Sequence, residues 1–286
     1  MVTAVEGHDA IAGTTNPSRT RFTDVRHVAE TGSTNADVMA LARQGESEGV
    51  VLVADHQTAG RGRAGRTWTA PPGASLLCTI LLRPPAPVAP MVTFALALAA
   101  SEAVEDLGGF RPGLKWPNDL VVDDGVTTRK LAGILAEAEW PPSAHNSGGY
   151  RAPAPHERAT VAAGIGLNVD WPDDLPEDLA DIAVAMNHVS GRSVERGVVL
   201  DRLLDRLDVH YSSMVRGGVD SVLDGWRERS ATLGRRVRVD LGPDDVVGTA
   251  VDVTTDGHLV LETLEGTTRT LAVGDVVHLR REPDPT

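Results

Sequence analysis

The amino-acid pattern changes near Leu233, and this change restricts the possible folds more than any other feature of the chain. Before Leu233, short apolar runs such as Ser75 to Arg83 alternate with stretches of helical periodicity such as Leu175 to Asn187. After it, short β-rich runs are separated by turn sequences such as Asp256-Gly257. We therefore predict a disordered leader at residues 1–22, an α+β domain at 23–232 and a small all-β domain at 233–286.

The strand predicted from Lys130 to Glu139 is apolar on both of its faces. Strict alternation places Lys130 on the same face as Ile134, and Gly133 on the opposite face. A strand of this kind is normally covered on both sides, so we expect helices on both faces of the sheet. Gly133 would leave room for something flat against the sheet, and the strand from Gly164 to Asn168 carries glycines in a similar arrangement.

Composition narrows the classes of function. Cys78 is the only cysteine, which excludes an intrachain disulfide, and its apolar surroundings favour a core residue over a nucleophile. The formal net charge of −13 argues against nonspecific binding to nucleic acid, which requires clustered cations. The N-terminus lacks a signal-peptide pattern, and the apolar run from Met91 to Ala100 is shorter than the about 20 residues that span a bilayer. We therefore expect a cytoplasmic protein with neither DNA nor a membrane as a partner.

Lysine occurs only twice, and both lysines lie in unusual motifs. Lys115 begins the sequence Lys-Trp-Pro-Asn-Asp, in which Pro117 and Asn118 favour a turn between Lys115 and Asp119. An ammonium and a carboxylate held by such a turn can meet a phosphate and Mg²⁺, respectively. The alternative is an ordinary strand-entry turn with a surface ion pair. Lys130 opens the strand that is apolar on both faces, where it needs an anionic or carbonyl partner unless its side chain reaches solvent.

The segment from Gly60 to Trp68 combines three glycines with three arginines. Glycines let backbone N–H groups approach a ligand closely, and guanidinium groups bind phosphate or carboxylate through paired donors. Both properties fit a flexible clamp over an anionic ligand. The alternatives are an Arg-Gly linker and an RNA-binding tract. Such tracts are long and repetitive, whereas this segment is short and lies between two predicted strands.

Five motifs, in this order, resemble the biotin–protein ligase family in the form that lacks an N-terminal DNA-binding domain. They are Gly-Ser-Thr-Asn at 32–35, Gln57 to Trp68, Lys115 to Asp119, Lys130 to Leu135 and Gly164 to Asn168. The resemblance implies a mixed sheet flanked by helices, similar to class II aminoacyl-tRNA synthetase cores, followed by an SH3-like barrel. It also implies ligation of biotin, with ATP and Mg²⁺, through biotinyl-5′-AMP to a lysine of the biotin carboxyl carrier domain of an acyl-CoA or pyruvate carboxylase.

The resemblance also implies residue roles, position by position. The residues expected to bind biotin are Ser33, Thr34, Asn35, Gln57, Arg61, Gly62, Arg63 and Lys130. The residues expected to bind ATP are Arg63, Arg66, Trp68, Lys115, Asn118 and Asn168. Those expected to act in catalysis are Lys130, Arg63, Lys115 and Asp119. Trp68 is expected to pack against the adenine, and Asp119 to hold the metal.

Two other classes of protein compete with this interpretation. A lipoate–protein ligase shares the core fold, but the arginine-rich loop and the Lys-Trp-Pro-Asn-Asp motif favour biotin. A non-enzymatic nucleotide- or DNA-binding regulator is disfavoured by the acidic composition and by the segment before Ser33, which is too short for a winged helix. We therefore expect a ligase that does not repress transcription, and a monomer or weak homodimer.

Overall fold

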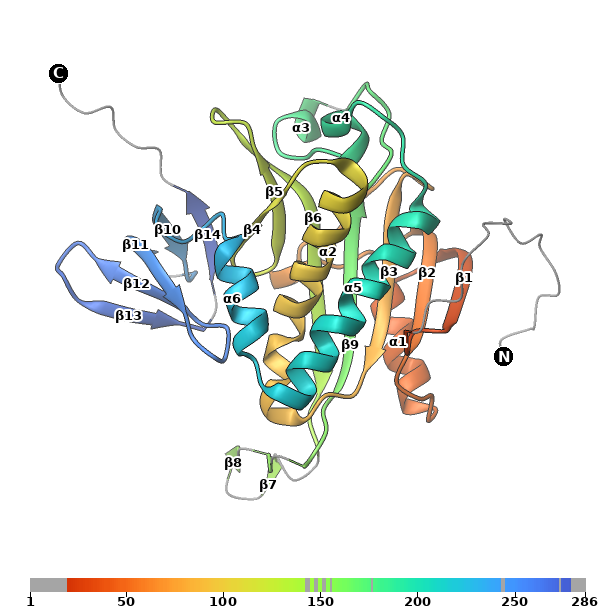
Figure 1. Cartoon of the computed structure of the whole chain (residues 1–286), viewed down its shortest axis with the longest axis horizontal. Helices are drawn as coiled ribbons and strands as arrows, with labels where there is room; N and C mark the ends of the chain where they lie inside the picture. The colour runs from red at the N-terminus through yellow and green to blue at the C-terminus, as the bar shows by residue number, and fades with distance from the viewer. Residues whose placement is uncertain are drawn as a thin grey trace.

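A seven-stranded mixed sheet forms the centre of the molecule, in the order β1-β2-β3-β9-β6-β5-β4 (Figure 1). The computed structural model describes residues 20–141, 145–146, 149–150, 153–154, 156–175, 177–242, 245–272 and 274–278. In this sheet β1 pairs with β2 in parallel, and the other neighbouring strands are antiparallel. The strands are β1 (Asp24–Thr31), β2 (Val50–Gln57), β3 (Ser75–Leu82), β4 (Gly113–Lys115), β5 (Asp119–Asp123), β6 (Thr128–Glu139) and β9 (Thr160–Asn168).

Helices cover both faces of this sheet, as predicted from its two-sided apolar strands. Helices α2 (Val92–Gly108) and α5 (Arg196–Gly217) pack together over one face, and α1 (Thr34–Arg43) lies behind the sheet in Figure 1. Alternation along β3 separates the two cores, because Ile80 belongs to the core under α2 whereas Leu81 packs with α1. The remaining helices are α3 (Glu177–Ala180), α4 (Met186–Ser190), α6 (Asp220–Glu228) and the 3₁₀ turns η1 (Arg63–Gly65) and η2 (Ala86–Met91).

The prediction of one helix from Leu175 to Asn187 is wrong. The short helices α3 and α4 flank an extended segment, in which Ala183 pairs in parallel with Lys130 of β6. The Lys130 N–H donates to Ile182 O at 2.8 Å, and the Val184 N–H donates to Lys130 O at 3.0 Å. This pairing satisfies backbone groups beside a buried strand, so it outweighs the local helical pattern.

The two edge strands, β1 and β4, escaped the sequence prediction. Both mix exposed and half-buried residues, so neither shows the continuous apolar run of the central strands. Two residues at the end of the predicted leader have structural contacts, because Phe22 is buried and Arg21 forms ion pairs with Glu48 and Asp208. Residues 1–19 and half of the predicted insertion loop at 141–156 lie outside the described residues, although β7 (His145–Asn146) and β8 (Gly149–Tyr150) pair within it.

The C-terminal part forms a second, five-stranded antiparallel sheet in the order β13-β12-β11-β10-β14. Its strands are β10 (Arg236–Asp240), β11 (Asp245–Val253), β12 (Leu259–Thr263), β13 (Thr268–Leu271) and β14 (Asp275–His278). The predicted β-rich C-terminal part is therefore confirmed. Trp116, in the Lys-Trp-Pro-Asn-Asp motif, is buried, and its Nε1–H donates to Gly257 O at 2.9 Å. This tryptophan thus attaches the small sheet to the large one.

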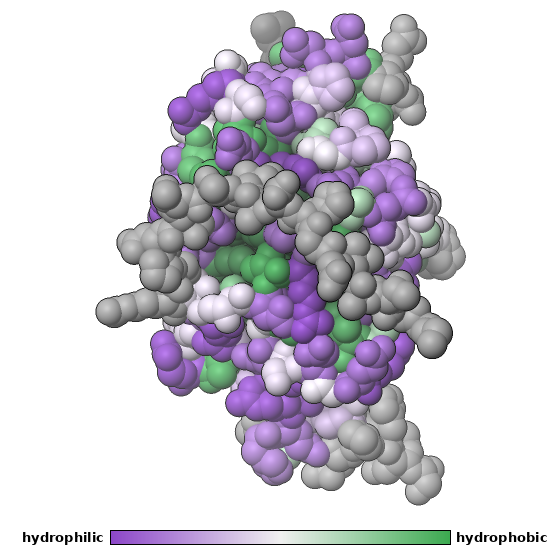
Figure 2. Space-filling model, turned by 90° about the vertical axis from the view of Figure 1, so that its right-hand side faces the viewer, coloured by the Kyte–Doolittle hydropathy of each residue, from purple (hydrophilic) through white to green (hydrophobic). Residues whose placement is uncertain are grey.

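The apolar segment around α2 is longer than the sequence analysis indicated. The described residues contain one helical stretch, Ala86–Gly108, that is long and apolar enough to span a membrane by length and composition alone. Most of this stretch is buried inside the protein, where it forms the middle of the main core. Cys78 is buried in the same core, and burial raises the pKa of its thiol to about 12, which confirms the predicted core role. Viewed from the side on which β1 lies, the surface is mostly hydrophilic (Figure 2).

Candidate functional site

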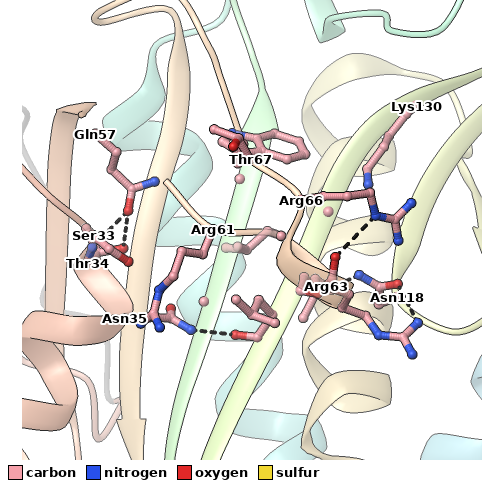
Figure 3. A pocket seen from close by; sticks show the side chains of 18 residues that line it. Ser33, Thr34, Asn35, Gln57, Arg61, Arg63, Arg66, Thr67, Asn118 and Lys130 are labelled. Carbon is pink, nitrogen blue, oxygen red and sulfur yellow. Dashed lines mark hydrogen bonds between the residues drawn. The ribbon is translucent and has the colours of Figure 1, made fainter. Parts of the chain in front are cut away.

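A pocket opens on the α1 face of the large sheet and gathers most of the residues singled out in the sequence (Figure 3). It encloses about 120 Å³, less than the roughly 300–1,000 Å³ of typical ligand pockets. Its lining residues are Ser33, Thr34, Asn35, Gln57, Arg61, Gly62, Arg63, Arg66, Thr67, Trp68, Asn118, Lys130, Gly133, Ile134, Leu135, Gly164, Ile165 and Gly166. Among the predicted site residues, those outside the lining are Lys115, Asp119 and Asn168.

One corner of the pocket is built around Gln57, at the end of β2. Its Oε1 accepts hydrogen bonds from the Thr34 N–H at 2.8 Å and from Thr34 Oγ1 at 3.1 Å. This pairing orients the amide, and Figure 3 shows its nitrogen directed toward the middle of the pocket. Ser33 occupies the N-cap position of α1, and its hydroxyl makes no capping bond. The corner therefore presents amide and hydroxyl groups that suit a neutral ligand group with a carbonyl oxygen.

Asn35 lies behind this corner and is fully engaged with the protein. Its Nδ2 donates to Leu135 O at 2.9 Å and to Glu137 Oε2 at 3.0 Å, and its Oδ1 accepts from Thr79 Oγ1 at 2.7 Å. Gly164 makes room for this amide, because a Cβ there would lie 2.0 Å from Asn35 Oδ1. Asn35 is thus placed to hold the start of α1 in position.

The floor of the pocket is a pair of strand glycines covered by an indole ring. A Cβ at Gly133 would lie 2.9 Å from Trp68 Cζ3, and a Cβ at Gly166 would lie 2.4 Å from Trp68 Cε2. The sequence predicts room for a flat group at Gly133, and here Trp68 fills that room. The indole Nε1 is buried and has no hydrogen-bond partner among the described residues. The ring therefore rests on the sheet without a polar anchor.

Strand β6 contains a bulge that reverses the predicted direction of Lys130. The register against β5 shifts by one residue between Leu120 and Val121, which leaves Leu131 as an extra residue. As a result, the Lys130 ammonium lies only 3.0 Å from where a Cβ would stand on Gly133, on the pocket face. The prediction from strict alternation, which put Lys130 on the opposite face, is wrong because alternation fails at a bulge.

The charged groups beside the floor carry an excess of positive charge. Lys130 Nζ lies 2.7 Å from Asp119 Oδ1 and 5.3 Å from the centre of the Trp68 ring. Lys115 is directly opposite Asp119 in the β4–β5 pair. Burial lowers the pKa of Lys115, while the Asp119 carboxylate acts to raise it. Two ammonium groups thus share one carboxylate, an arrangement suited to a further anion.

Two arginines of the Gly60–Trp68 loop reach the small sheet. Arg63 donates to Asn118 Oδ1 at 3.3 Å and to Gly274 O at 3.5 Å. Arg66 forms an ion pair with Asp275 at 2.8 Å. The loop is therefore attached to the C-terminal sheet in this structure, by contacts that an anionic ligand would have to replace.

The two predicted asparagines have different positions. Asn118 lines the pocket, and its Nδ2 donates to Ile134 O at 2.7 Å. Asn168 is buried, and its Nδ2 donates to Val184 O at 3.0 Å. Asn168 thus holds the extended segment before α4 against β9, and it lies outside the pocket lining although its Nδ2 also donates to Lys130 O at 3.4 Å.

A divalent metal would have few protein ligands here. The described residues contain no group of three or more His, Cys, Asp or Glu that could hold a metal ion. Mg²⁺ often binds through one or two carboxylates together with substrate phosphates, so Asp119 fits such a site only with phosphate present.

Sequence reasoning missed two polar residues of the site. Thr79 is fully buried and lies 2.8 Å from Thr34 Oγ1, besides its bond to Asn35. Glu137 accepts hydrogen bonds from Asn35 and from Arg61, both at 3.0 Å. The available signal was a polar residue within or beside an apolar run, Leu76 to Leu82 for Thr79 and Leu131 to Ala136 for Glu137. Such a residue indicates that a hydrogen-bonding partner exists but does not show which residue that partner is.

Comparison with known proteins agrees with this geometry. Residues 30–140 match the model of the biotin/lipoate A/B protein ligase family, and residues 232–279 match the biotin protein ligase C-terminal domain. The chain is 38% identical over 261 residues to a biotin–[acetyl-CoA-carboxylase] ligase of Mycobacterium tuberculosis, with 88% of each chain covered. This chain belongs to the biotin protein ligase family.

Further relatives extend the comparison beyond one sequence. This biotin protein ligase homologue is 30% identical over 238 residues to a bifunctional ligase/repressor of Bacillus subtilis, covering 82% of the chain and 68% of that relative. Its fold matches a biotin protein ligase from Aquifex aeolicus, solved in complex with biotin and ATP, with a TM-score of 0.70 and 26% identity. That match covers 91% of this chain and 100% of the other. The family predicted from the motifs is therefore confirmed.

Proposed function

We propose that this protein catalyses the ATP-dependent ligation of biotin to a lysine of a biotin carboxyl carrier domain. The observation that carries this proposal is the pocket. Its two ends differ in charge, and Gly133 and Gly166 form the floor between them. Gln57 and Thr34 supply a neutral polar corner at one end, and Arg63 and Lys130 supply cations at the other. A ligand with a neutral ureido head and an acidic tail, such as biotin, matches both ends.

The first reaction step joins two anions. A carboxylate oxygen of biotin attacks the α-phosphorus of ATP, the bond from that phosphorus to the bridging oxygen breaks, and pyrophosphate leaves with the electron pair. Lys130 and Arg63 offset the repulsion between the carboxylate and the phosphate, and the fixed corner at Gln57 positions the head. The product is the mixed anhydride biotinyl-5′-AMP.

The second step transfers the acyl group to the carrier. The neutral amine of the carrier lysine attacks the acyl carbon, an amide forms, AMP leaves, and the amine loses a proton to solvent. This route uses no covalent enzyme intermediate. Cys78, the single cysteine, is buried with its thiol pKa raised to about 12, so it takes no part.

The loop from Gly60 to Trp68 must open to admit substrates. The pocket encloses about 120 Å³, below the roughly 300–1,000 Å³ of typical ligand pockets, because Trp68 rests on Gly133 and Gly166. We propose that the loop leaves the floor, then closes over the bound ligands with Trp68 against the adenine. Closure would exclude water and protect the anhydride from hydrolysis.

The proposal has finer parts that rest on the family resemblance. Lys115, Arg66, Asn118 and Asn168 act on the nucleotide, and Asp119 holds Mg²⁺ with the phosphates. The large domain, residues 23–232, is similar to class II aminoacyl-tRNA synthetase cores, and residues 233–286 form an SH3-like unit. The protein acts in the cytoplasm as a monomer or weak homodimer, and it modifies carriers of acyl-CoA or pyruvate carboxylases without a DNA or membrane partner.

ATP–pyrophosphate exchange tests the proposal most directly. Purified protein is incubated with ATP, Mg²⁺ and labelled pyrophosphate, with biotin in one series and lipoate in a parallel series. We expect exchange that depends on biotin alone. Exchange with lipoate alone would support the adenylation reaction but show that lipoate, and not biotin, is the substrate. No exchange with either acid would contradict the ligase proposal.

A further inference from the structure

Glu137 lies where three elements of the pocket meet. It projects from β6, and its Oε2 lies 3.0 Å from Asn35 Nδ2 of α1 and 3.0 Å from an Arg61 guanidinium nitrogen of the loop. One carboxylate oxygen therefore joins the strand, the helix and the loop. We propose that Glu137 is a positioning residue for biotin binding, an inference that rests on the proposed function.

The first arm of this junction fixes a buried amide. Asn35 is 5% exposed, and its two amide hydrogens point to Leu135 O and to Glu137. In Glu137→Gln, one neutral amide oxygen has to accept from both Arg61 and this buried N–H, or else the new NH2 group faces the N–H, so the bond to Asn35 is weakened or lost. Turning the Asn35 amide toward another acceptor would break its bonds with Leu135 O and Thr79 Oγ1. The adjacent Thr34, which orients Gln57, would then shift with the start of α1.

The second arm tethers the loop from Gly60 to Trp68. Arg61 forms an isolated antiparallel bridge with Thr67, so holding Arg61 also holds the returning segment that carries Trp68. The side chains of Arg61 and Glu137 are 47% and 31% exposed, so this ion pair contributes little to overall stability. Its effect is on geometry, because it fixes the loop base next to the corner. Both arms together align the corner with the loop.

Glu139, two residues further along β6, offers a matched control. It forms an ion pair with Arg43 of α1, so it links the same strand to the same helix. Neither residue of that pair lines the pocket. Glu139→Gln therefore removes one charged contact between β6 and α1, as Glu137→Gln does, but it changes no residue of the proposed site.

The experiment compares Glu137→Gln, Glu139→Gln and the unchanged protein. Equilibrium dialysis with labelled biotin measures affinity, ATP–pyrophosphate exchange gives kcat and both KM values, and thermal unfolding reports stability. We expect Glu137→Gln to weaken biotin binding and raise the KM for biotin about tenfold, the equivalent of roughly 1.4 kcal/mol. The KM for ATP and kcat should change less than about twofold, and Glu139→Gln should match the unchanged protein in every assay.

A double-mutant cycle with Arg61→Gln separates the two arms. If Glu137 acts through Arg61, the double variant loses less biotin affinity than the sum of the single losses, whereas additive losses assign the effect to Asn35. If Glu137→Gln unfolds, Glu137→Asp takes its place, because it keeps the charge but shortens the reach to Asn35 and Arg61, and it must itself weaken biotin binding.

The outcomes distinguish this inference from the proposed function. Equal biotin affinity for Glu137→Gln and Glu139→Gln overturns the role of Glu137 while the ligase activity of the unchanged protein stands. An unchanged protein that binds biotin without exchange overturns the ligase proposal, and the affinity comparison still decides the role of Glu137. An unchanged protein that binds no biotin overturns both.

Discussion

The two ends of the pocket differ in how firmly they are held. At the corner, Thr34 and Gln57 are bonded to each other, and Thr79 is fully buried beneath them. In the loop, Arg66 is held by a largely exposed ion pair, and Ala64 has a positive φ of 53°. The corner is therefore organised before a ligand arrives, whereas exposed ion pairs worth about 0–1 kcal/mol let the loop rearrange.

This contrast assigns ligand recognition to the corner and the chemical step to the end that carries the loop. A pre-organised corner lowers the cost of binding the ligand head, since no polar group has to be reoriented. A loop held by weak contacts can release them to substrate anions and then exclude water. The predictions below alter one end at a time.

The largest effect is expected for Lys130→Ala. This change removes the ammonium that faces the reacting anions, so ATP–pyrophosphate exchange should fall by about 10²–10³-fold, as for loss of a donor to developing charge. Biotin binding, measured by dialysis, should fall much less because the corner is untouched. Lys130→Arg is the control, and we expect poor recovery since the planar fork does not replace a compact ammonium. Unchanged exchange in Lys130→Ala would contradict the assigned role.

Gly164→Ala should damage the firm end of the pocket. The new Cβ would lie 2.0 Å from Asn35 Oδ1, and Thr79 Oγ1 at 3.1 Å limits the space further. We expect a loss of about 1–3 kcal/mol in the free energy of unfolding, measured with urea, because the overpacked amide has nowhere to move. Biotin affinity should fall with it. A variant with normal stability and affinity would show that the corner is softer than its hydrogen bonds indicate.

Gly166→Ala is the matched change at the movable end. Its Cβ would lie 2.4 Å from Trp68 Cε2, but the indole belongs to a loop that can lift from the floor. The free energy of unfolding should therefore change by only about 0.5 kcal/mol, because the indole can move away from the new methyl group. The KM for ATP should rise while biotin affinity is retained. Destabilisation as large as in Gly164→Ala would mean that the loop is not free to move.

The smallest expected effect is a change in tryptophan fluorescence when substrates bind. Trp68 rests on the sheet with Lys130 5.3 Å from its ring, and substrates must displace it. Binding of biotin with ATP should therefore change the emission, whereas Trp116, Trp171 and Trp226 are buried and should contribute little. Trp68→Phe should abolish most of the change. A signal that persists in this variant would place the moving tryptophan elsewhere.

Local patterns predicted much of the fold because strand and helix periodicity follow from short-range geometry. The central strands β3, β5, β6 and β9 and the helices α1, α2 and α5 lie close to their predicted positions. The edge strand β1 and the extended segment at Ile182 escaped prediction. Both depend on pairing with another strand, which no local window contains.

Sequence alone determined which residues carry charge, which positions lack a side chain, and the order of the five motifs. These are properties of the covalent chain, and the motifs sufficed to indicate the family. Tertiary structure decided how those residues meet. The bulge at Leu131 turned Lys130 toward the pocket, and packing brought Glu137 to Asn35, 102 positions away in the chain. Such contacts depend on register and packing across the whole sheet, where small local preferences are outweighed by the burial of many residues together.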